Sequence, residues 1–240
     1  MYCVIFGGTG GVGSALAEKM FKKGYDLHIL GRNESKLKHM AERYKARYTI
    51  FDILDPEAQP ILAKILDRPI DALAYCIGSI NLKPFLKLTR DDFILDSLLN
   101  SIGAALAIQS SIPYLKQSQE ISSVILFSSV AARHGFSAHA SISMAKAAVE
   151  GLTVSLAAEL SPKIRVNCIA PSLLDTPLAA SLTSSAALKQ AIADSHPMKR
   201  LGRPDDAADL ASYLLSSEAS WMTGQIIGID GGRSSLSVRG

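Results

Sequence analysis

Cysteine is scarce in this sequence, and its spacing excludes common metal sites. The 240 residues include three cysteines, Cys3, Cys76 and Cys168, each inside a separate apolar stretch that predicts a strand. No Cys-x-x-Cys pair or Cys/His cluster has the spacing of metal ligands. We therefore expect three small buried thiols in a reducing compartment and no bound metal.

Long apolar runs and blocks of one charge are also missing. No run approaches the ~20 residues that span a bilayer. Residues 1–6 lack the basic start and the longer apolar stretch of a signal peptide. The 25 basic and 22 acidic residues are scattered, and the net charge of +3 includes no dense basic block. We expect a cytoplasmic protein that binds neither membranes nor nucleic acid.

Short apolar stretches and helical patterns alternate along the whole chain. The stretches rich in β-branched residues predict seven strands, at residues 2–6, 26–30, 48–51, 72–77, 123–127, 165–170 and 225–229. Between them, segments such as 12–23 and 34–45 have apolar residues at three- and four-residue spacing. Strands that are apolar on both faces are typical of a parallel sheet covered by helices on each side. We predict one α/β domain over residues 1–240, a Rossmann-type doubly wound fold with a mostly parallel seven-stranded sheet and helices on both faces.

A glycine-rich loop follows the first predicted strand and leads into the first predicted helix. Glycine allows a tight turn and lets backbone N–H groups approach a pyrophosphate, which the helix N-terminus attracts. The alternative is a glycine-rich connection without a ligand, but the strand–loop–helix context favours a dinucleotide site. The candidate contacts are Gly7, Thr9, Gly10, Gly11, Val12 and Gly13.

The end of the second predicted strand bears on the choice of dinucleotide. An acidic residue there would accept a hydrogen bond from the ribose 2′-hydroxyl of NAD, but this sequence has Gly31 followed by Arg32. A guanidinium pairs bidentately with a phosphate, so we expect NADP, with NAD as the alternative. Arg32 could also be an ordinary solvated loop residue.

These motifs resemble those of the short-chain dehydrogenase/reductase family along essentially the whole chain. The family's Gly-x-x-x-Gly-x-Gly pattern fits Gly7, Gly11 and Gly13, and its C-terminal motif fits residues 200–204 and 224–232. The resemblance implies a homotetramer or a homodimer. It also implies cofactor contacts at Asp52, Ile53, Gly78, Lys146, Pro171 and Thr176.

The family's catalytic set is present with one member missing. Ser129, Lys146 and Asn100 match the family's catalytic serine, lysine and helix asparagine. The family's proton-donating tyrosine lies four residues before the lysine, and here that position is Ile142, which cannot donate a proton. The surrounding string resembles the family without a gap on either side, so the register is difficult to shift.

His139 is the substitute acid that we consider. It lies seven residues before Lys146, which is close to two helical turns and about 10 Å along the same helix stripe. A divergent branch of the family, which includes enoyl-thioester reductases, places its tyrosine at this spacing, and an imidazole can act as an acid near neutral pH. The glycine loop does not follow that branch's pattern, and histidine is shorter than tyrosine. The alternative is a loop or helix-start histidine with no catalytic part.

Two functions from different classes stay open. The first is an NADP-dependent oxidoreductase that transfers a hydride to or from a carbonyl, an alcohol or an activated alkene. The second is a catalytically silent dinucleotide binder that acts as a sensor, a scaffold or a partner subunit, which the missing tyrosine motivates. Residues 173–200, rich in Leu, Ala and Ser, are expected to form a substrate lid, and the sequence does not identify the small-molecule substrate.

Overall fold

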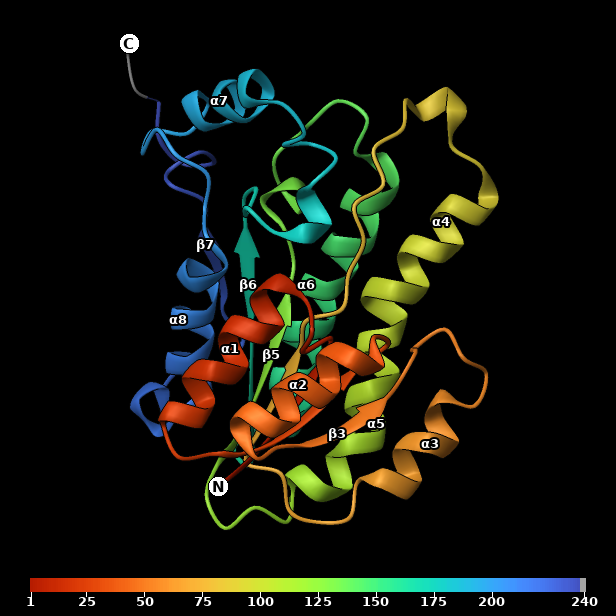
Figure 1. Cartoon of the computed structure of the whole chain (residues 1–240), viewed down its shortest axis with the longest axis vertical. Coiled ribbons are helices and arrows are strands. Elements are labelled where there is room, and N and C mark those ends of the chain that lie inside the picture. The colour runs from red at the N-terminus through yellow and green to blue at the C-terminus, as the bar shows by residue number, and fades with distance from the viewer. Residues whose placement is uncertain (238–240) are drawn as a thin grey trace.

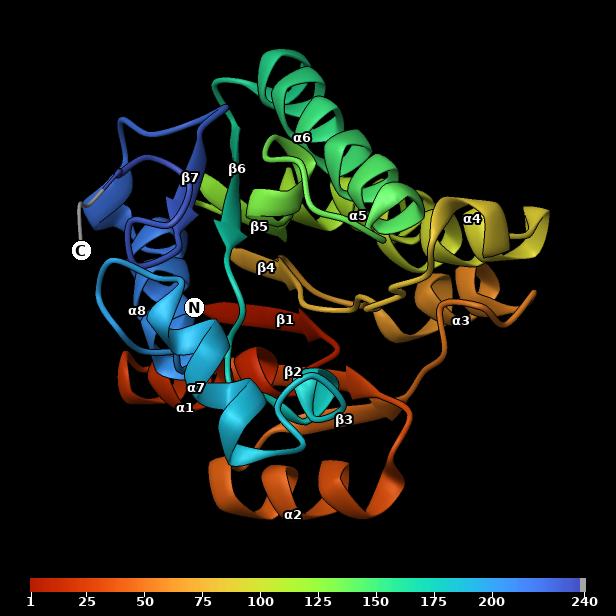
Figure 2. The same ribbon diagram turned by 90° about the horizontal axis from the view of Figure 1, so that it is seen from above.

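A computed structural model describes residues 1–237 of the chain. Its seven strands form one sheet (Figure 1), in the order β3-β2-β1-β4-β5-β6-β7 that can be followed in Figure 2, and every neighbouring pair is parallel. The strands are β1 Tyr2–Phe6, β2 Asp26–Gly31, β3 Arg47–Ile50, β4 Ala72–Tyr75, β5 Ser122–Phe127, β6 Ile164–Pro171 and β7 Ile226–Ile229. The predicted doubly wound α/β fold with a parallel seven-stranded sheet is therefore confirmed.

Helices cover both faces of the sheet, as the apolar strands require. The α-helices are α1 Gly11–Lys22, α2 Glu34–Tyr44, α3 Ala58–Ile65, α4 Arg90–Ser97, α5 Gly103–Leu115, α6 Ala140–Leu160, α7 Ala186–Asp194 and α8 Pro204–Leu215. Figure 2 shows α1, α2 and α8 on one side of the sheet and α3, α5 and α6 on the other.

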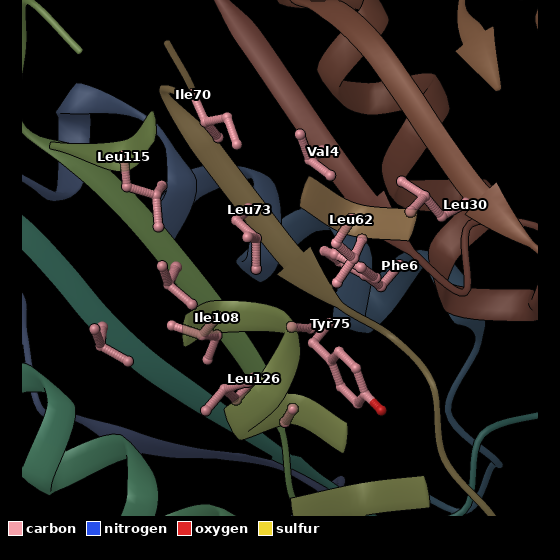
Figure 3. Packing of buried hydrophobic residues seen from close by; sticks show 14 of the residues in the cluster. Val4, Phe6, Leu30, Leu62, Ile70, Leu73, Tyr75, Ile108, Leu115 and Leu126 are labelled. Atoms are coloured by element: carbon pink, nitrogen blue, oxygen red, sulfur yellow. The ribbon is translucent and has the colours of Figure 1, made fainter. Parts of the chain in front are cut away.

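Each face of the sheet buries its own hydrophobic core, because successive side chains of a strand point to opposite faces. In β1, Val4 and Phe6 pack toward α3, α5 and α6, whereas Ile5 packs toward α1, α2 and α8. Figure 3 shows the first of these cores, in which Leu62 of α3 and Ile108 of α5 meet the strands. Two buried faces hold the strands in a fixed register, which in turn fixes where each strand ends.

The chain reverses its winding direction between β1 and β4, and the two strands separate at their carboxyl ends. The amide of Cys76 still donates to the carbonyl of Phe6 at 2.8 Å, but Gly7 then turns away with a φ of +72°. The strand predicted at 72–77 therefore ends at Tyr75, where β1 no longer lies beside it. In doubly wound sheets ligands bind in the crevice that opens at this point.

One helical stretch, Arg90–Leu115, is long and apolar enough to cross a membrane by length and composition. It joins α4 to α5 through a π-helical turn at Leu98–Ile102. In α5, Ala104, Ala107 and Ile108 are fully buried in the core of the sheet. Packing in the core therefore explains the apolar composition of α5, but only 33% of the apolar window of the whole stretch is buried.

Candidate active site

A cavity of about 380 Å³ opens at the carboxyl ends of β4, β5 and β6. Its lining is mainly apolar. It brings together residues that the sequence singled out in separate segments, namely Val12, Gly78, Ser129, His139, Ile142, Lys146, Pro171 and Thr176. The cavity at the crevice of the sheet therefore includes three of the four catalytic candidates, Ser129, His139 and Lys146, and part of the predicted cofactor-binding set.

The glycine loop leaves the N-terminus of α1 open to a ligand. No side chain caps this helix, so the first-turn amides point out of the helix without a side-chain acceptor. A Cβ on Gly13 would collide with the carbonyl oxygen of Gly7, and a Cβ on Gly11 would lie 2.6 Å from Cγ2 of Thr176. Only glycine therefore fits at positions 11 and 13, and Thr176 packs against Gly11 while Gly10 stays exposed. Such a terminus fits a pyrophosphate.

The end of β2 offers space and charge for an adenosine phosphate. The side chain of Arg32 is 74% exposed, and its Nη1 lies 3.9 Å from Oδ2 of Asp52. A Cβ on Gly31 would lie 2.9 Å from Oγ1 of Thr9, so an acidic side chain has no room here unless Thr9 moves. Ile53 packs its side chain into the hydrophobic core, which leaves only its backbone to face a cofactor.

Asn100 and Lys146 converge on Gly78. A Cβ on Gly78 would lie 3.1 Å from Oδ1 of Asn100 and 3.2 Å from Nζ of Lys146. The amide nitrogen of Asn100 donates to the carbonyl oxygen of Asp96 at 2.7 Å and to Oγ of Ser79 at 2.9 Å. These bonds fix the amide, and its buried Oδ1 has no hydrogen-bond partner among the described residues. A hydrogen-bond donor from a ligand fits this orphaned acceptor.

Lys146 is held in place while its charge is disfavoured. Its Nζ donates to the carbonyl oxygen of Phe127 at 2.9 Å, and the side chain is buried. Burial lowers the pKa of Lys146 to about 8, although the nearby Cys168, Asp96 and Cys76 raise it. The ammonium is therefore mostly charged at pH 7 and becomes neutral under mildly alkaline conditions.

Ser129 points a usable hydroxyl at the cavity, but Ile142 does not add a proton donor. Oγ of Ser129 accepts a hydrogen bond from the amide of Ala131 at 3.1 Å, which leaves the hydroxyl proton for another partner. Ile142 is buried, lies on α6 one turn before Lys146 and contributes an apolar wall. The position where the resemblance implies a tyrosine is thus inert in proton transfer.

His139 is the titratable side chain of the segment before α6 that lines the cavity. Its Nδ1 lies 2.7 Å from the carbonyl oxygen of Ser137, and because a carbonyl only accepts, Nδ1 carries a proton. Its Nε2 then keeps the lone pair in the neutral ring. The ring packs beside Phe136 with the centroids 5.3 Å apart. The geometry leaves Nε2 as the atom that can exchange a proton.

Two other groups near the crevice are not proton donors to the cavity. Tyr75 is buried, and its hydroxyl donates to the carbonyl oxygen of Leu99 at 2.8 Å. Burial raises the pKa of the Cys76 thiol to about 12. Cys3 and Cys168 are buried in the sheet as expected, whereas Cys76 follows β4 and lines the cavity. The expectation of three buried thiols in strands is therefore wrong for Cys76, which lies outside the strand and is partly exposed, although the surrounding protein desolvates its thiol.

The sequence analysis missed two polar networks beside the cavity. Asp96 is 1% exposed, and its carboxylate accepts hydrogen bonds from Ser79, Asn81 and Ser141. The available signal is the position of Asp96 on α4, four residues before Asn100, which places the two on one face of the helical stretch.

The second network ties the segment after β6 to the sheet. His196 is buried, and its Nδ1 donates to the carbonyl oxygen of Ile192 at 2.8 Å. Oγ of Ser172 therefore donates to Nε2 of His196, also at 2.8 Å. No spacing in the sequence reveals this bond, because its partners lie 24 residues apart.

Known proteins resemble this chain along its full length. Residues 7–234 match a family model described as enoyl-(acyl carrier protein) reductase. A tropinone reductase homologue of Arabidopsis thaliana is 30% identical over 250 residues, which cover 100% of this chain and 80% of that protein. A 3-oxoacyl-[acyl-carrier-protein] reductase of Aquifex aeolicus is 30% identical over 95% of each chain. The structure of a short-chain type dehydrogenase/reductase from Mycobacterium ulcerans has a TM-score of 0.89 and 28% identity, and covers 97% of this chain and 89% of that one.

Proposed function

Because the chain belongs to the short-chain dehydrogenase/reductase family, we propose that it is an NADP-dependent oxidoreductase acting on a carbonyl, an alcohol or an activated alkene. The observation that carries the proposal is the convergence of Asn100 and Lys146 on Gly78. A buried acceptor without a partner is costly unless a ligand or water satisfies it. Here it lies beside an ammonium, at the crevice where doubly wound folds bind dinucleotides.

The residues around the crevice divide the tasks of binding. The first-turn amides of α1 would hold the pyrophosphate, Arg32 would pair with a 2′-phosphate, and Lys146 would hold ribose hydroxyls. The bound nicotinamide supplies or accepts the hydride. The free hydroxyl proton of Ser129 would bond to the reacting oxygen of the substrate, which orients it.

We assign proton donation to His139. Its Nδ1–H is fixed on Ser137, so Nε2 takes up a proton from solvent and releases it into the cavity. Ile142 shields this part of the cavity without exchanging protons. The substrate lid proposed at 173–200 has support in the apolar side chains of Leu173, Leu178 and Leu182, which line the same cavity.

A catalytically silent dinucleotide binder is the second candidate. The observation that favours it is Ile142, a buried apolar side chain one turn before Lys146. Under this function the protein would bind the cofactor without catalysing a reaction. Binding would change only the conformation of the protein. Binding of NADPH alone therefore does not separate the two candidates.

Assembly into a homotetramer or homodimer is also proposed. Its support is the exposure of large apolar side chains on neighbouring helices, since such faces are costly in water. These are Ile94, Leu98 and Ile102 on the α4–α5 stretch and Met144 and Val154 on α6. Sedimentation equilibrium of the purified protein would measure the assembly.

Turnover and cofactor binding together test the function. NADPH and NADH are titrated by fluorescence, and consumption of NADPH is then followed with a panel of ketones and activated alkenes. His139→Gln is expected to lower kcat on the order of 10²-fold, the usual contribution of a general acid. The matched control is His134→Gln, because His134 also packs on Phe136, at 5.0 Å, but does not line the cavity.

The outcomes separate the candidates. Steady turnover that Lys146→Ala abolishes excludes the silent binder. Turnover that survives His139→Gln unchanged removes the assignment of the acid. If wild type binds NADPH but only Ile142→Tyr turns over any substrate, the silent binder is the correct function. Binding of neither dinucleotide contradicts both.

A further inference from the structure

The cavity contains one arginine among its apolar walls. Arg233 lies in the turn after β7 and lines the cavity together with Phe136. Its guanidinium carbon lies 4.8 Å from the centroid of the Phe136 ring, a cation–π contact. Arg233 is half-buried, and this burial lowers its pKa. A cation is therefore held against the wall of an apolar cavity.

Arg233 has no carboxylate partner among the described residues. No ion pair in residues 1–237 includes it, whereas the similarly half-buried Lys19 pairs with Asp205 and Asp209. The acidic residue nearest in sequence is Asp230, and its carboxylate accepts hydrogen bonds from the amides of Gly232, at 2.8 Å, and Ser234, at 2.9 Å. The Asp230 carboxylate is thus hydrogen-bonded within its own turn and does not pair with Arg233.

Arg233 packs against a part of the cavity wall that is shared with a second hollow. Phe136, on which it stacks, also lines the shallow surface hollow formed by residues 131–140. Lys146, by contrast, lies buried beside Gly78. The rest of the lining is mainly apolar, with Leu178, Leu182 and Ile192 contributed by the segment after β6. A molecule that fills the cavity would therefore meet mainly hydrocarbon, together with the charged groups of Lys146 and Arg233.

We propose that the substrate is an apolar molecule that carries a carboxylate, and that Arg233 binds this carboxylate. The inference rests on the proposed oxidoreductase function, whose substrate class it names. A guanidinium donates to both oxygens of a carboxylate, and the low polarity of the cavity strengthens the pair. The other cation on the cavity wall, Lys146, already donates to the carbonyl oxygen of Phe127. Neutral substrates of the same length would leave Arg233 half-desolvated without a partner.

Binding of a matched pair of ligands tests the proposal without requiring turnover. Octanoate and octanamide have the same hydrocarbon chain and differ in charge at one end. Their dissociation constants are measured by calorimetry on the protein with and without NADP⁺. Octanoate is expected to bind at least about tenfold more tightly than octanamide, since charge-assisted hydrogen bonds are stronger than neutral ones. Arg233→Met is expected to remove this ratio, and Arg233→Lys to restore part of it.

The chain offers a matched control. The guanidinium carbon of Arg68 also lies 4.8 Å from an aromatic centroid, that of Tyr2, but Arg68 does not line the cavity. Arg68→Met removes the same charge and the same kind of stacking, and it is expected to leave the octanoate/octanamide ratio unchanged. If Arg233 only clamps the terminal turn onto Phe136, Arg233→Met will weaken both ligands equally, which overturns the proposal.

Two further results also overturn it. These are equal affinities of the two ligands in wild type, and failure of octanoate to bind up to its solubility limit. The failure of the proposed function is distinguishable, because it shows in the turnover assay. If the protein binds octanoate through Arg233 but consumes no NADPH, the proposed ligand class holds and the proposed oxidoreductase function fails.

Discussion

Ser141 donates a hydrogen bond of 2.7 Å to Oδ2 of the buried Asp96. This bond joins α6, one residue before Ile142, to α4, four residues before Asn100. Ser79 donates to the other oxygen of Asp96 at 2.7 Å and at the same time accepts from the amide of Asn100. Asp96 is therefore the centre of a network that fixes the direction of Asn100.

Asp96→Asn is expected to disturb the orientation of the Asn100 side-chain amide. The new amide group would place a donor against hydroxyl and amide donors, so the network must rearrange, at a cost of about 1–3 kcal/mol in unfolding free energy. The proposed enzyme is expected to lose roughly tenfold in kcat. Loss of the Asp96 charge would also lower the pKa of Lys146 further below about 8. The upper limb of the pH–rate profile is then expected to move to lower pH.

The pH–rate profile separates positioning from mere packing. A variant that only weakens the fold would lower the melting temperature without moving the alkaline limb. Asp209→Asn serves as the control, because Asp209 pairs with Lys19 on the surface of α8. An unchanged profile in Asp96→Asn would contradict a positioning role.

Lys146→Met is expected to stabilise the protein without cofactor and to weaken NADPH binding. The pKa of Lys146 is about 8 in the fold and about 10.5 when exposed. The unfolded chain therefore binds more protons between these pH values, so stability rises with pH across that window and the full cost of burial is present at pH 7. Removing the charge should raise the unfolding free energy at pH 7 by about 1–2 kcal/mol after the lost hydrogen bond is subtracted.

Urea unfolding at pH 7 and pH 10 measures this gain, which should shrink at the higher pH. Lys163→Met is the control, since Lys163 also donates to a backbone carbonyl, that of Ser118 at 2.6 Å, but is only half-buried. It is expected to lose stability. A destabilised Lys146→Met at pH 7 would mean that burial of this ammonium costs little.

His28 is expected to limit stability in acid. Its Nδ1 lies 3.0 Å from the Tyr2 hydroxyl and its Nε2 2.8 Å from Oγ1 of Thr49, so it links β2 to both neighbouring strands. Burial lowers the pKa of His28 to about 4 from the ordinary 6.5. The unfolded chain binds the proton first, so stability falls as pH drops from 6.5 to 4, by up to about 1.4 kcal/mol per pH unit.

Melting temperatures between pH 4 and 7 test this dependence. His28→Gln should flatten the acid limb, while His39→Gln, which changes an exposed histidine of α2, should leave it unchanged. Parallel curves for wild type and His28→Gln would show that other groups control acid unfolding.

Arg32→Gln is expected to raise the Kd for NADPH about tenfold and to leave that for NADH unchanged, because only NADPH carries the 2′-phosphate. Fluorescence titration measures both constants. Arg43→Gln is the matched control, since Arg43 is also exposed and pairs weakly with Glu18, at 3.5 Å. Equal losses for the two dinucleotides would assign Arg32 a role in folding the loop rather than in binding the phosphate.

The periodicity of the sequence predicted the sheet because each strand is buried on both faces and each helix covers one of them. The errors in the predicted strands are at their ends. The strand predicted at 72–77 stops at Tyr75 because its neighbour β1 has already ended. The residues of the predicted strand itself do not reveal where β1 ends. Similarly, Cys76 belongs to an apolar run but leaves the sheet there and reaches the cavity.

The candidate site was predictable where a motif places its residues, as for Ser129 and Lys146 on the cavity wall. It was not predictable where the interaction joins distant segments. The bond between Asp96 and Ser141 spans 45 residues, and that between Ser172 and His196 spans 24. The role proposed for Arg233 depends on its contact with the Phe136 ring, which only the fold brings about. The spacing of residues along the sequence does not predict such long-range contacts.

The contact between Gly31 and Thr9 bears on how this site can evolve. An aspartate at position 31, the simplest route toward NAD, would bring its Cβ within 2.9 Å of the Thr9 hydroxyl, so the single substitution carries a steric penalty before it gains any new partner. A smaller residue at position 9 would relieve that penalty while bringing no benefit by itself. A single Gly31→Asp substitution is therefore disfavoured on steric grounds unless position 9 changes with it.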